Sequence, residues 1–252
     1  MQTQVKTPKE IDNIRRSGLI LAEVVDFIIR SAKPGMSTKD LADLAALQLK
    51  EYNKAKPAFL NYHGFPHVLC VSVNSQVIHG VPKDSIIIDD GDVVSVDFGV
   101  NYKGMITDAA RTFVVGKTNS SKKLLIDKTE QALFAGIEVV KNSTRVGTIS
   151  SEIEKILRQA KLGIVREYVG HGVGHELHEE PNIPNYGKAG TGPILEAGMT
   201  VAIEPMATLG GEGVYIEDDD WTVTTTDGSL AAHFEDTILV TDDGFEILTR
   251  LN

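Results

Sequence analysis

Two antiparallel strands are predicted by the stretch Val93-Val-Ser-Val-Asp-Phe-Gly-Val-Asn-Tyr-Lys-Gly-Met-Ile-Thr-Asp-Ala-Ala-Arg-Thr-Phe113. Apolar residues alternate on both sides of Asn101-Tyr-Lys-Gly104, which is typical of a short turn between strands. If Asn101 pairs with Gly104, Asp97 lies directly opposite Asp108. If Lys103-Gly104 forms the turn instead, Asp108 becomes a diagonal neighbour of Asp97 on the same face. Either register brings two carboxylates within reach of each other.

Two carboxylates held this close repel each other unless a cation lies between them. The repulsion is roughly 4 kcal/mol at about 4 Å when the effective dielectric constant is near 20. The hairpin therefore indicates a metal site. The alternative is ordinary turn chemistry, in which one Asp caps the turn and the other faces water. Other polar residues of the chain decide between the two.

The composition indicates a soluble globular protein, with 42% hydrophobic and 24% charged residues among 252. A net charge of −10 argues against broad binding of nucleic acid or membranes through a basic surface. The single cysteine, Cys70, excludes an internal disulfide and suits a reducing compartment. No apolar run approaches the ~18 residues that a membrane span needs. The first residues lack the apolar core of a signal peptide, so we expect a cytoplasmic protein.

The chain before the hairpin reads as two helices and a strand. Thr7-Pro-Lys-Glu10 has the pattern of a capping box, and that helix ends at Lys33-Pro-Gly35. A second helix begins at Ser37, with leucines predicted on its buried side at positions 41, 44, 47 and 49. Residues 68–74 read as a strand and residues 77–82 as a loop that carries His79.

The same order of elements is repeated after the hairpin. Helices are predicted over 120–142 and 148–162, followed by strands at 164–169, 200–204, 214–217, 222–226, 233–240 and 246–248. The expected class is α+β, with a mainly antiparallel sheet, helices on its outer side and two related halves. No linker divides the chain, so residues 1–252 are expected to form one domain.

A second polar stretch, Tyr168-Val-Gly-His-Gly-Val-Gly-His-Glu-Leu-His-Glu-Glu-Pro181, places three histidines among three glycines. Glycines at such spacing let the backbone approach a ligand closely. The stretch does not match HExxH, because that motif starting at His175 would need His where Glu179 stands. We interpret His175 as a hydrogen-bonded loop residue, and His171 and His178 as functional.

Two further carboxylates lie in apolar strand contexts. Glu204 ends a predicted strand before Pro205, and Glu235 begins another. Alternation places Asp236 on the opposite face from Glu235. A carboxylate near a buried face is costly unless it is paired or metal-bound. Each Glu alone could be a salt-bridge partner at a strand end.

Four such carboxylates and one histidine together match a dinuclear metal centre. Oxygen-rich ligands with one imidazole suit Mn(II), Fe(II) or Co(II) and do not single out zinc. Such a centre acidifies water near neutral pH and polarises a carbonyl, as amide hydrolysis requires. The donors would be Asp97, Asp108, His171, Glu204 and Glu235.

These motifs, together with Tyr62-His-Gly64, His79-Gly-Val-Pro82, His178-Glu-Glu-Pro181 and Trp221, resemble type I methionine aminopeptidase over nearly the whole chain. No CxxC precedes the domain, which resembles the short bacterial form without a zinc-finger extension. The resemblance implies the "pita-bread" α+β fold with two pseudo-symmetric halves. It also implies a monomeric, cytoplasmic enzyme that removes the initiator methionine from nascent proteins and peptides whose second residue is small. Association with the ribosome is a further expectation, whereas binding to DNA or membranes is not expected.

The resemblance also assigns roles to residues. Asp108 and Glu235 would bridge two divalent ions (Co, Mn or Fe, with Zn or Ni as alternatives), Asp97 would complete one metal site, and His171 and Glu204 the other. Glu204 would accept a proton, while His178 would contact the oxyanion and His79 the scissile amide nitrogen. The methionine pocket would be lined by Phe59, Tyr62, Phe65, Cys70, His79, Leu177 and Trp221. Phe59 and Leu177 stand where familiar bacterial members have a cysteine and a phenylalanine, so an edge-on aromatic contact with the thioether is lost at Leu177.

Three other interpretations of the sequence are less consistent with its motifs. Another hydrolase of this fold, an X-Pro aminopeptidase or dipeptidase, usually carries an additional N-terminal domain, but only 96 residues precede Asp97. A non-catalytic binding protein of this fold would be expected to lose metal ligands, yet all five residues are present. A nucleophilic role for Cys70 lacks a partnering base, and no GxSxG occurs.

Overall fold

The central hairpin forms in the computed structural model, which describes residues 5–251. Strands β4 (Val93–Tyr102) and β5 (Met105–Val114) pair so that Gly99 faces Asp108 and Asp97 faces Ala110. Asp97 and Asp108 are therefore diagonal neighbours, the second of the two predicted registers. The two-residue turn has positive φ at both Lys103 (53°) and Gly104 (88°), which matches the twist of the flanking strands.

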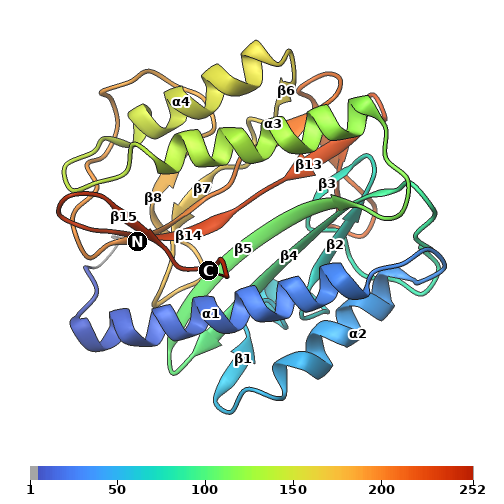
Figure 1. Cartoon of the computed structure of the whole chain (residues 1–252), viewed down its shortest axis with the longest axis horizontal. Coiled ribbons are helices and arrows are strands. Elements are labelled where there is room, and N and C mark those ends of the chain that lie inside the picture. The colour runs from blue at the N-terminus through green and yellow to red at the C-terminus, as the bar shows by residue number, and fades with distance from the viewer. Residues whose placement is uncertain (1–4, 252) are drawn as a thin grey trace.

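The first half of the chain places two helices on one side of a four-stranded sheet (Figure 1). Helix α1 (Pro8–Ser31) and helix α2 (Thr38–Leu49) both begin with complete capping boxes, as predicted. The sheet contains β1 (Ala55–Pro57), β4, β2 (Cys70–Val73) and β5. Leu47 is 60% exposed, so its predicted burial is wrong. The buried stripe of α2 runs through Leu41, Ala45 and Leu49 at a spacing of four, and Leu47 lies on the opposite side.

The second half places α3 (Ser120–Ile137) and α4 (Val146–Gln159) on the opposite outer side (Figure 1). They cover a five-stranded sheet in the order β15 (Phe245–Ile247), β14 (Asp236–Val240), β9 (Thr200–Ile203), β7 (Gly170–Gly172) and β8 (Glu179–Ile183). Two small sheets complete the fold: β13 (Ala231–His233), β10 (Met206–Thr208), β6 (Gly163–Ile164); and β11 (Val214–Ile216), β12 (Val223–Thr225), β3 (Gln76–Ile78). The short 3₁₀ turn η1 spans Tyr62–Gly64. The predicted α+β class with antiparallel sheet and outer helices is confirmed.

The predicted strand over 233–240 is wrong, because two strands, β13 and β14, stand in its place with Phe234 and Glu235 between them. His233 pairs with Met206 in one sheet, whereas Asp236 pairs with Ile203 in another. The neighbouring segment, which pairs with both of these strands, is interrupted at the same level: Glu204 and Pro205 separate β9 from β10. Both glutamates thus lie where the chain passes from one sheet to the next.

Other boundaries also differ from prediction. The predicted helix 120–142 ends at Ile137, and the strand 68–74 is limited to β2. Of the predicted strand 164–169, only Ile164 lies in β6. The short strands β1, β3, β7, β8 and β10 were not predicted, and β3 covers the first two residues of the predicted loop 77–82. Among residues 5–251, no helix combines the length and the apolar character needed to cross a membrane.

The two halves meet along β5. Ala110 and Glu235 exchange two backbone hydrogen bonds (3.3 and 3.0 Å). Thr237 Oγ1 accepts a hydrogen bond from the Asp108 backbone N–H (2.9 Å) and donates one to the Asp108 carbonyl (2.8 Å). These bonds fix the hairpin and the Glu235 segment relative to each other.

Candidate metal centre

A cavity of about 240 Å³ lies where the two halves meet. All thirteen side chains predicted to act in the site line it: Phe59, Tyr62, Phe65, Cys70, His79, Asp97, Asp108, His171, Leu177, His178, Glu204, Trp221 and Glu235. Two further histidines, His63 and His233, also line it.

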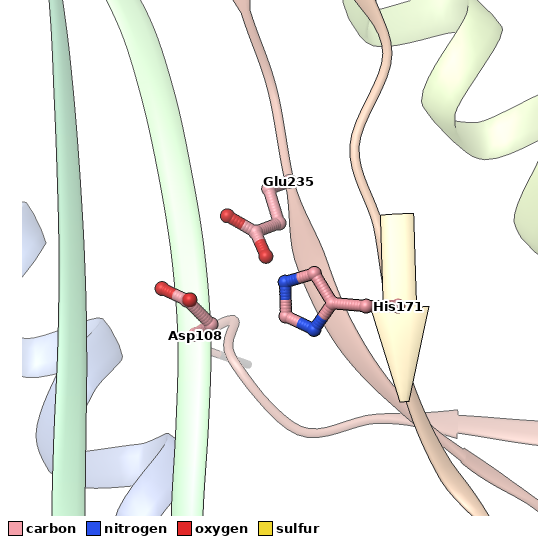
Figure 2. Close-up of side chains that lie close together, drawn as sticks. All are labelled: Asp108, His171 and Glu235. Carbon is pink, nitrogen blue, oxygen red and sulfur yellow. The ribbon is translucent and has the colours of Figure 1, made fainter. Parts of the chain in front are cut away.

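Three of the five predicted ligands converge most tightly. Asp108, His171 and Glu235 each offer a ligand atom, and these atoms lie within 4.8 Å of one another (Figure 2). His171 Nδ1 lies 2.9 Å from the Gly172 carbonyl, which can only accept, so Nδ1 carries the hydrogen and the Nε2 lone pair is available to a metal. His171 Nε2 is 3.5 Å from Glu204 Oε1. Asp97 joins them through the register of the hairpin.

The electrostatics of the centre favour a bound cation. Burial raises the pKa of Asp97, Glu204 and Glu235 well above their ordinary values, and repulsion from neighbouring carboxylates adds to the rise. Burial also raises the pKa of Asp108 to about 7. Asp97 Oδ1, Asp108 Oδ1 and Glu235 Oε1 are buried and lack a hydrogen-bond partner among the residues the structure describes. Four carboxylates would neutralise two divalent ions, so the donor set fits a dinuclear centre.

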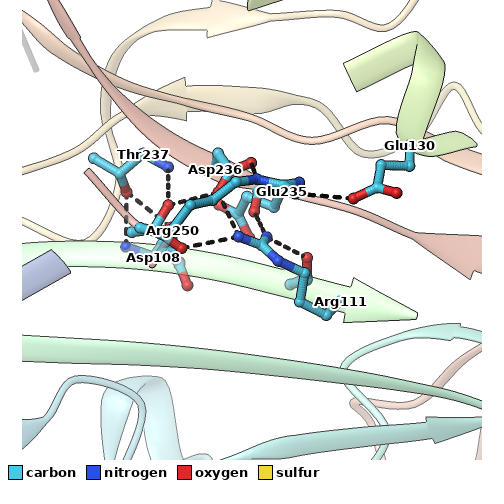
Figure 3. A network of polar contacts seen from close by, with 9 residues as sticks. Asp108, Arg111, Glu130, Glu235, Asp236, Thr237 and Arg250 are labelled. Carbon is cyan, nitrogen blue, oxygen red and sulfur yellow. Dashed lines mark hydrogen bonds and ion pairs between the residues drawn. The ribbon is translucent and has the colours of Figure 1, made fainter. Parts of the chain in front are cut away.

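A network behind the centre anchors Glu235 (Figure 3). Its neighbour Asp236 faces the opposite way, as alternation predicts, and is fully buried. The Asp236 carboxylate accepts hydrogen bonds from Arg111 (2.6 Å) and from Arg250 (2.7 Å). Arg111 also donates to the backbone carbonyls of Glu235 and Ala110. The two guanidinium groups thereby fix the backbone from which Glu235 projects.

A second network holds the loop that carries Leu177 and His178. Glu179 Oε1 accepts hydrogen bonds from the backbone N–H groups of His175 (2.7 Å) and Glu176 (3.1 Å). Its other oxygen lies 2.8 Å from Lys6 Nζ, in an ion pair with side-chain exposures of 5% and 0%. His175 Nε2 is 3.0 Å from Glu10 Oε1, which agrees with its interpretation as a hydrogen-bonded loop residue.

The remaining lining is apolar and aromatic. Phe65 and Trp221 meet edge to face with ring centroids 5.2 Å apart, and the Tyr62 hydroxyl is 2.9 Å from His178 Nδ1. Burial, followed by repulsion from the carboxylates, raises the pKa of the Cys70 thiol well above its ordinary value. The thiol therefore stays protonated, and Cys70 is a lining residue rather than a nucleophile.

The sequence reasoning missed His63, His233 and Lys6. His63 stands inside the Tyr62-His-Gly64 motif, and His233 precedes Glu235 by two residues, the spacing of one strand face. Either signal could have drawn attention to them. Lys6 gives no local signal, because its partner Glu179 is 173 residues away.

Comparison with known proteins agrees with this geometry. The sequence profile described as "Metallopeptidase family M24" matches residues 12–242. The methionine aminopeptidase of Clostridium acetobutylicum is 44% identical over 97% of this chain and 98% of its own. The crystal structure of methionine aminopeptidase from Thermotoga maritima superposes with a TM-score of 0.97 at 42% identity, covering 99% of this chain and 100% of that one. The prolidase from Pyrococcus furiosus is less similar (TM-score 0.78, 26% identity), and this chain covers only 66% of it. The predicted pita-bread architecture is thus confirmed.

Proposed function

The chain belongs to metallopeptidase family M24, among the methionine aminopeptidases, and removes N-terminal methionine; we propose that it does so with a dinuclear centre held by Asp97, Asp108, His171, Glu204 and Glu235. The observation that carries the proposal is the convergence of these five side chains on one cavity. The tight group of Asp108, His171 and Glu235 supports the proposal that these three side chains would together hold metal. Two divalent ions bound there would acidify a water near neutral pH and polarise the scissile carbonyl.

Three residues of the cavity carry out the proton transfer and bind the reacting groups of the substrate. Glu204 accepts the proton of the attacking water and relays it to the leaving amine. His178, exposed at the mouth of the cavity, donates a hydrogen bond to the developing oxyanion. Burial lowers the pKa of His79 to about 4, so His79 is neutral at pH 7 and contacts the scissile amide nitrogen as a hydrogen-bond partner.

The apolar side of the cavity receives the methionine side chain. Phe59, Phe65, Cys70 and Leu177 are buried there, beside Tyr62, His79 and Trp221. A volume of about 240 Å³ holds one large side chain and leaves little space for another, which supports a preference for a small second residue. The physiological substrate would be the initiator methionine of nascent proteins.

We also propose that residues 1–252 form one catalytic domain that acts as a monomer in the cytoplasm, on chains that leave the ribosome. All five proposed ligands come from one chain, which supports the monomer. A single cysteine supports a reducing compartment, and the net charge of −10 gives no support for nucleic-acid binding.

The test is activity and metal content after anaerobic reconstitution of the apoprotein with Mn, Fe, Co or Zn. We expect the loaded protein to cleave Met-Gly-Met-Met and to leave X-Pro peptides intact. Preferred cleavage of the X-Pro bond would overturn the specificity. Absence of tight divalent binding would overturn the dinuclear centre and favour a binding protein of the same fold.

A further inference from the structure

His233 is a buried histidine that lines the cavity beside the proposed metal ligands. It ends β13, is 2% exposed, and its Nε2 is buried and has no hydrogen-bond partner among residues 5–251. Thr112 Oγ1 accepts a hydrogen bond from the His233 backbone N–H (2.9 Å) and donates one to its carbonyl (2.7 Å). Its backbone also pairs with Met206, so the sheet holds the backbone from which the ring projects.

The nearest acidic group is Glu204. His233 Nε2 lies 3.4 Å from Glu204 Oε2, and among residues 5–251 no other carboxylate lies within 4.0 Å of its ring nitrogens. The other oxygen, Oε1, lies 3.5 Å from His171 Nε2. The Glu204 carboxylate is thus flanked by two imidazoles, one beside each oxygen. His171 presents its lone pair, as derived above, and this leaves His233 as the candidate donor.

We propose that His233 is a positioning residue for Glu204, whose Nε2–H donates a hydrogen bond to Oε2 and keeps Oε1 directed toward the metal held with His171. The proposal rests on the proposed function, because it takes Glu204 to be a metal ligand. A ligating carboxylate is normally oriented by a hydrogen bond to its second oxygen, and loss of such a partner typically weakens metal binding 10- to 100-fold. An imidazole left unpaired in the interior would be costly, and this bond satisfies it.

Metal affinity separates this role from a structural one. We would titrate apoprotein with Mn(II) by calorimetry under anaerobic conditions, comparing wild type, His233→Leu and His233→Gln. The leucine variant should bind the tighter ion about 10- to 100-fold more weakly. The glutamine variant should stay within about threefold of wild type, because its amide N–H can replace the imidazole donor. His67→Gln, at a histidine outside the cavity lining, is the matched control and should not change affinity.

Thermal unfolding of the apoproteins supplies the second readout. In the metal-free structure His233 Nε2 makes no hydrogen bond within residues 5–251, and the proposed bond to Glu204 would form when the metal binds, so His233→Leu should not lower the unfolding temperature of the apoprotein. Steady-state kinetics on the loaded forms should show a lower kcat with little change in KM, and the glutamine variant should restore kcat.

Three results would overturn the proposal. The first is wild-type Mn(II) affinity in His233→Leu. The second is a loss of affinity in His233→Gln as large as that in His233→Leu, which would make the imidazole itself necessary. The third is a lower unfolding temperature of the His233→Leu apoprotein. If wild type itself fails to bind Mn(II), the proposed function is wrong instead, so the two failures are distinguishable.

Discussion

Gly99 lies directly opposite Asp108 in the β4–β5 ladder, and the Phe59 ring occupies the space above it. A Cβ at position 99 would lie 2.6 Å from Cε1 of that ring and 2.9 Å from the Ala58 Cβ. The hairpin therefore supplies a carboxylate on one strand, and the missing side chain on the other strand admits the Phe59 ring, which lines the cavity.

Gly99→Ala should disturb both neighbours. Overpacking of this kind costs about 1–3 kcal/mol of unfolding free energy. Displacement of the Phe59 ring should also raise KM for methionyl peptides. Chemical denaturation and steady-state kinetics measure the two effects. Gly211→Ala is the control, because a Cβ there meets no atom closer than 3.5 Å. Unchanged stability and KM in Gly99→Ala would contradict the packing described here.

His79→Ala should separate substrate contact from metal binding. We expect kcat to fall roughly 10²-fold, the loss typical of removing one well-placed polar group. Metal content should stay at the wild-type level, because His79 is not among the proposed ligands. Elemental analysis after desalting, beside kinetics, tests both points. If the metals are lost with the side chain, His79 is itself a ligand and the assignment is wrong.

Metal affinity should increase with pH through neutrality. In the metal-free protein, burial raises the pKa of Asp108 to about 7 and raises those of Asp97, Glu204 and Glu235 well above their ordinary values, so protons compete with a cation for these groups and Asp108 holds one at about pH 6. A cation must displace those protons, and binding weakens as pH falls. Calorimetry at about pH 6, 7 and 8, in buffers that differ in ionisation enthalpy, measures affinity and proton release. Equal affinity at the three values would contradict the raised pKa of these carboxylates.

Lys6→Met should destabilise the protein by about 3–5 kcal/mol, because it leaves the buried Glu179 carboxylate without its cation. Movement of the 174–179 loop should lower kcat/KM, since that loop carries His178. The double variant Lys6→Met/Glu179→Gln should recover much of the stability, because glutamine is uncharged and its carbonyl can still accept from the loop N–H groups. Equal stability of the single and double variants would show that the ion pair is not what anchors the loop.

The sequence identified which residues meet but not how the strands around them pair. Asp97 and Asp108 were placed on one face in either register, because the side-chain period of a strand guarantees it. The register itself depends on Lys103, a residue with no special tendency toward positive φ, so the turn could not be assigned from the sequence alone.

The strand breaks at Glu204 and Glu235 were harder to predict. Pro205 indicated the end of one strand, but nothing local in 233–240 shows that the chain changes sheets at Glu235. That change depends on pairing with β9, β10 and β5, which are distant in sequence. Ion pairs such as Lys6–Glu179 cannot be predicted from local sequence patterns either, because the two residues are distant in sequence.

The five proposed donors are divided between the two halves of the chain, so metal binding would show whether the two halves are assembled. Asp97 and Asp108 belong to the segment before α3, and His171, Glu204 and Glu235 to the segment after it. A polypeptide broken in the connection between β5 and α3 would leave two donors on one fragment and three on the other. Metal binding would then report that the fragments had reassembled, because the proposed centre takes donors from both.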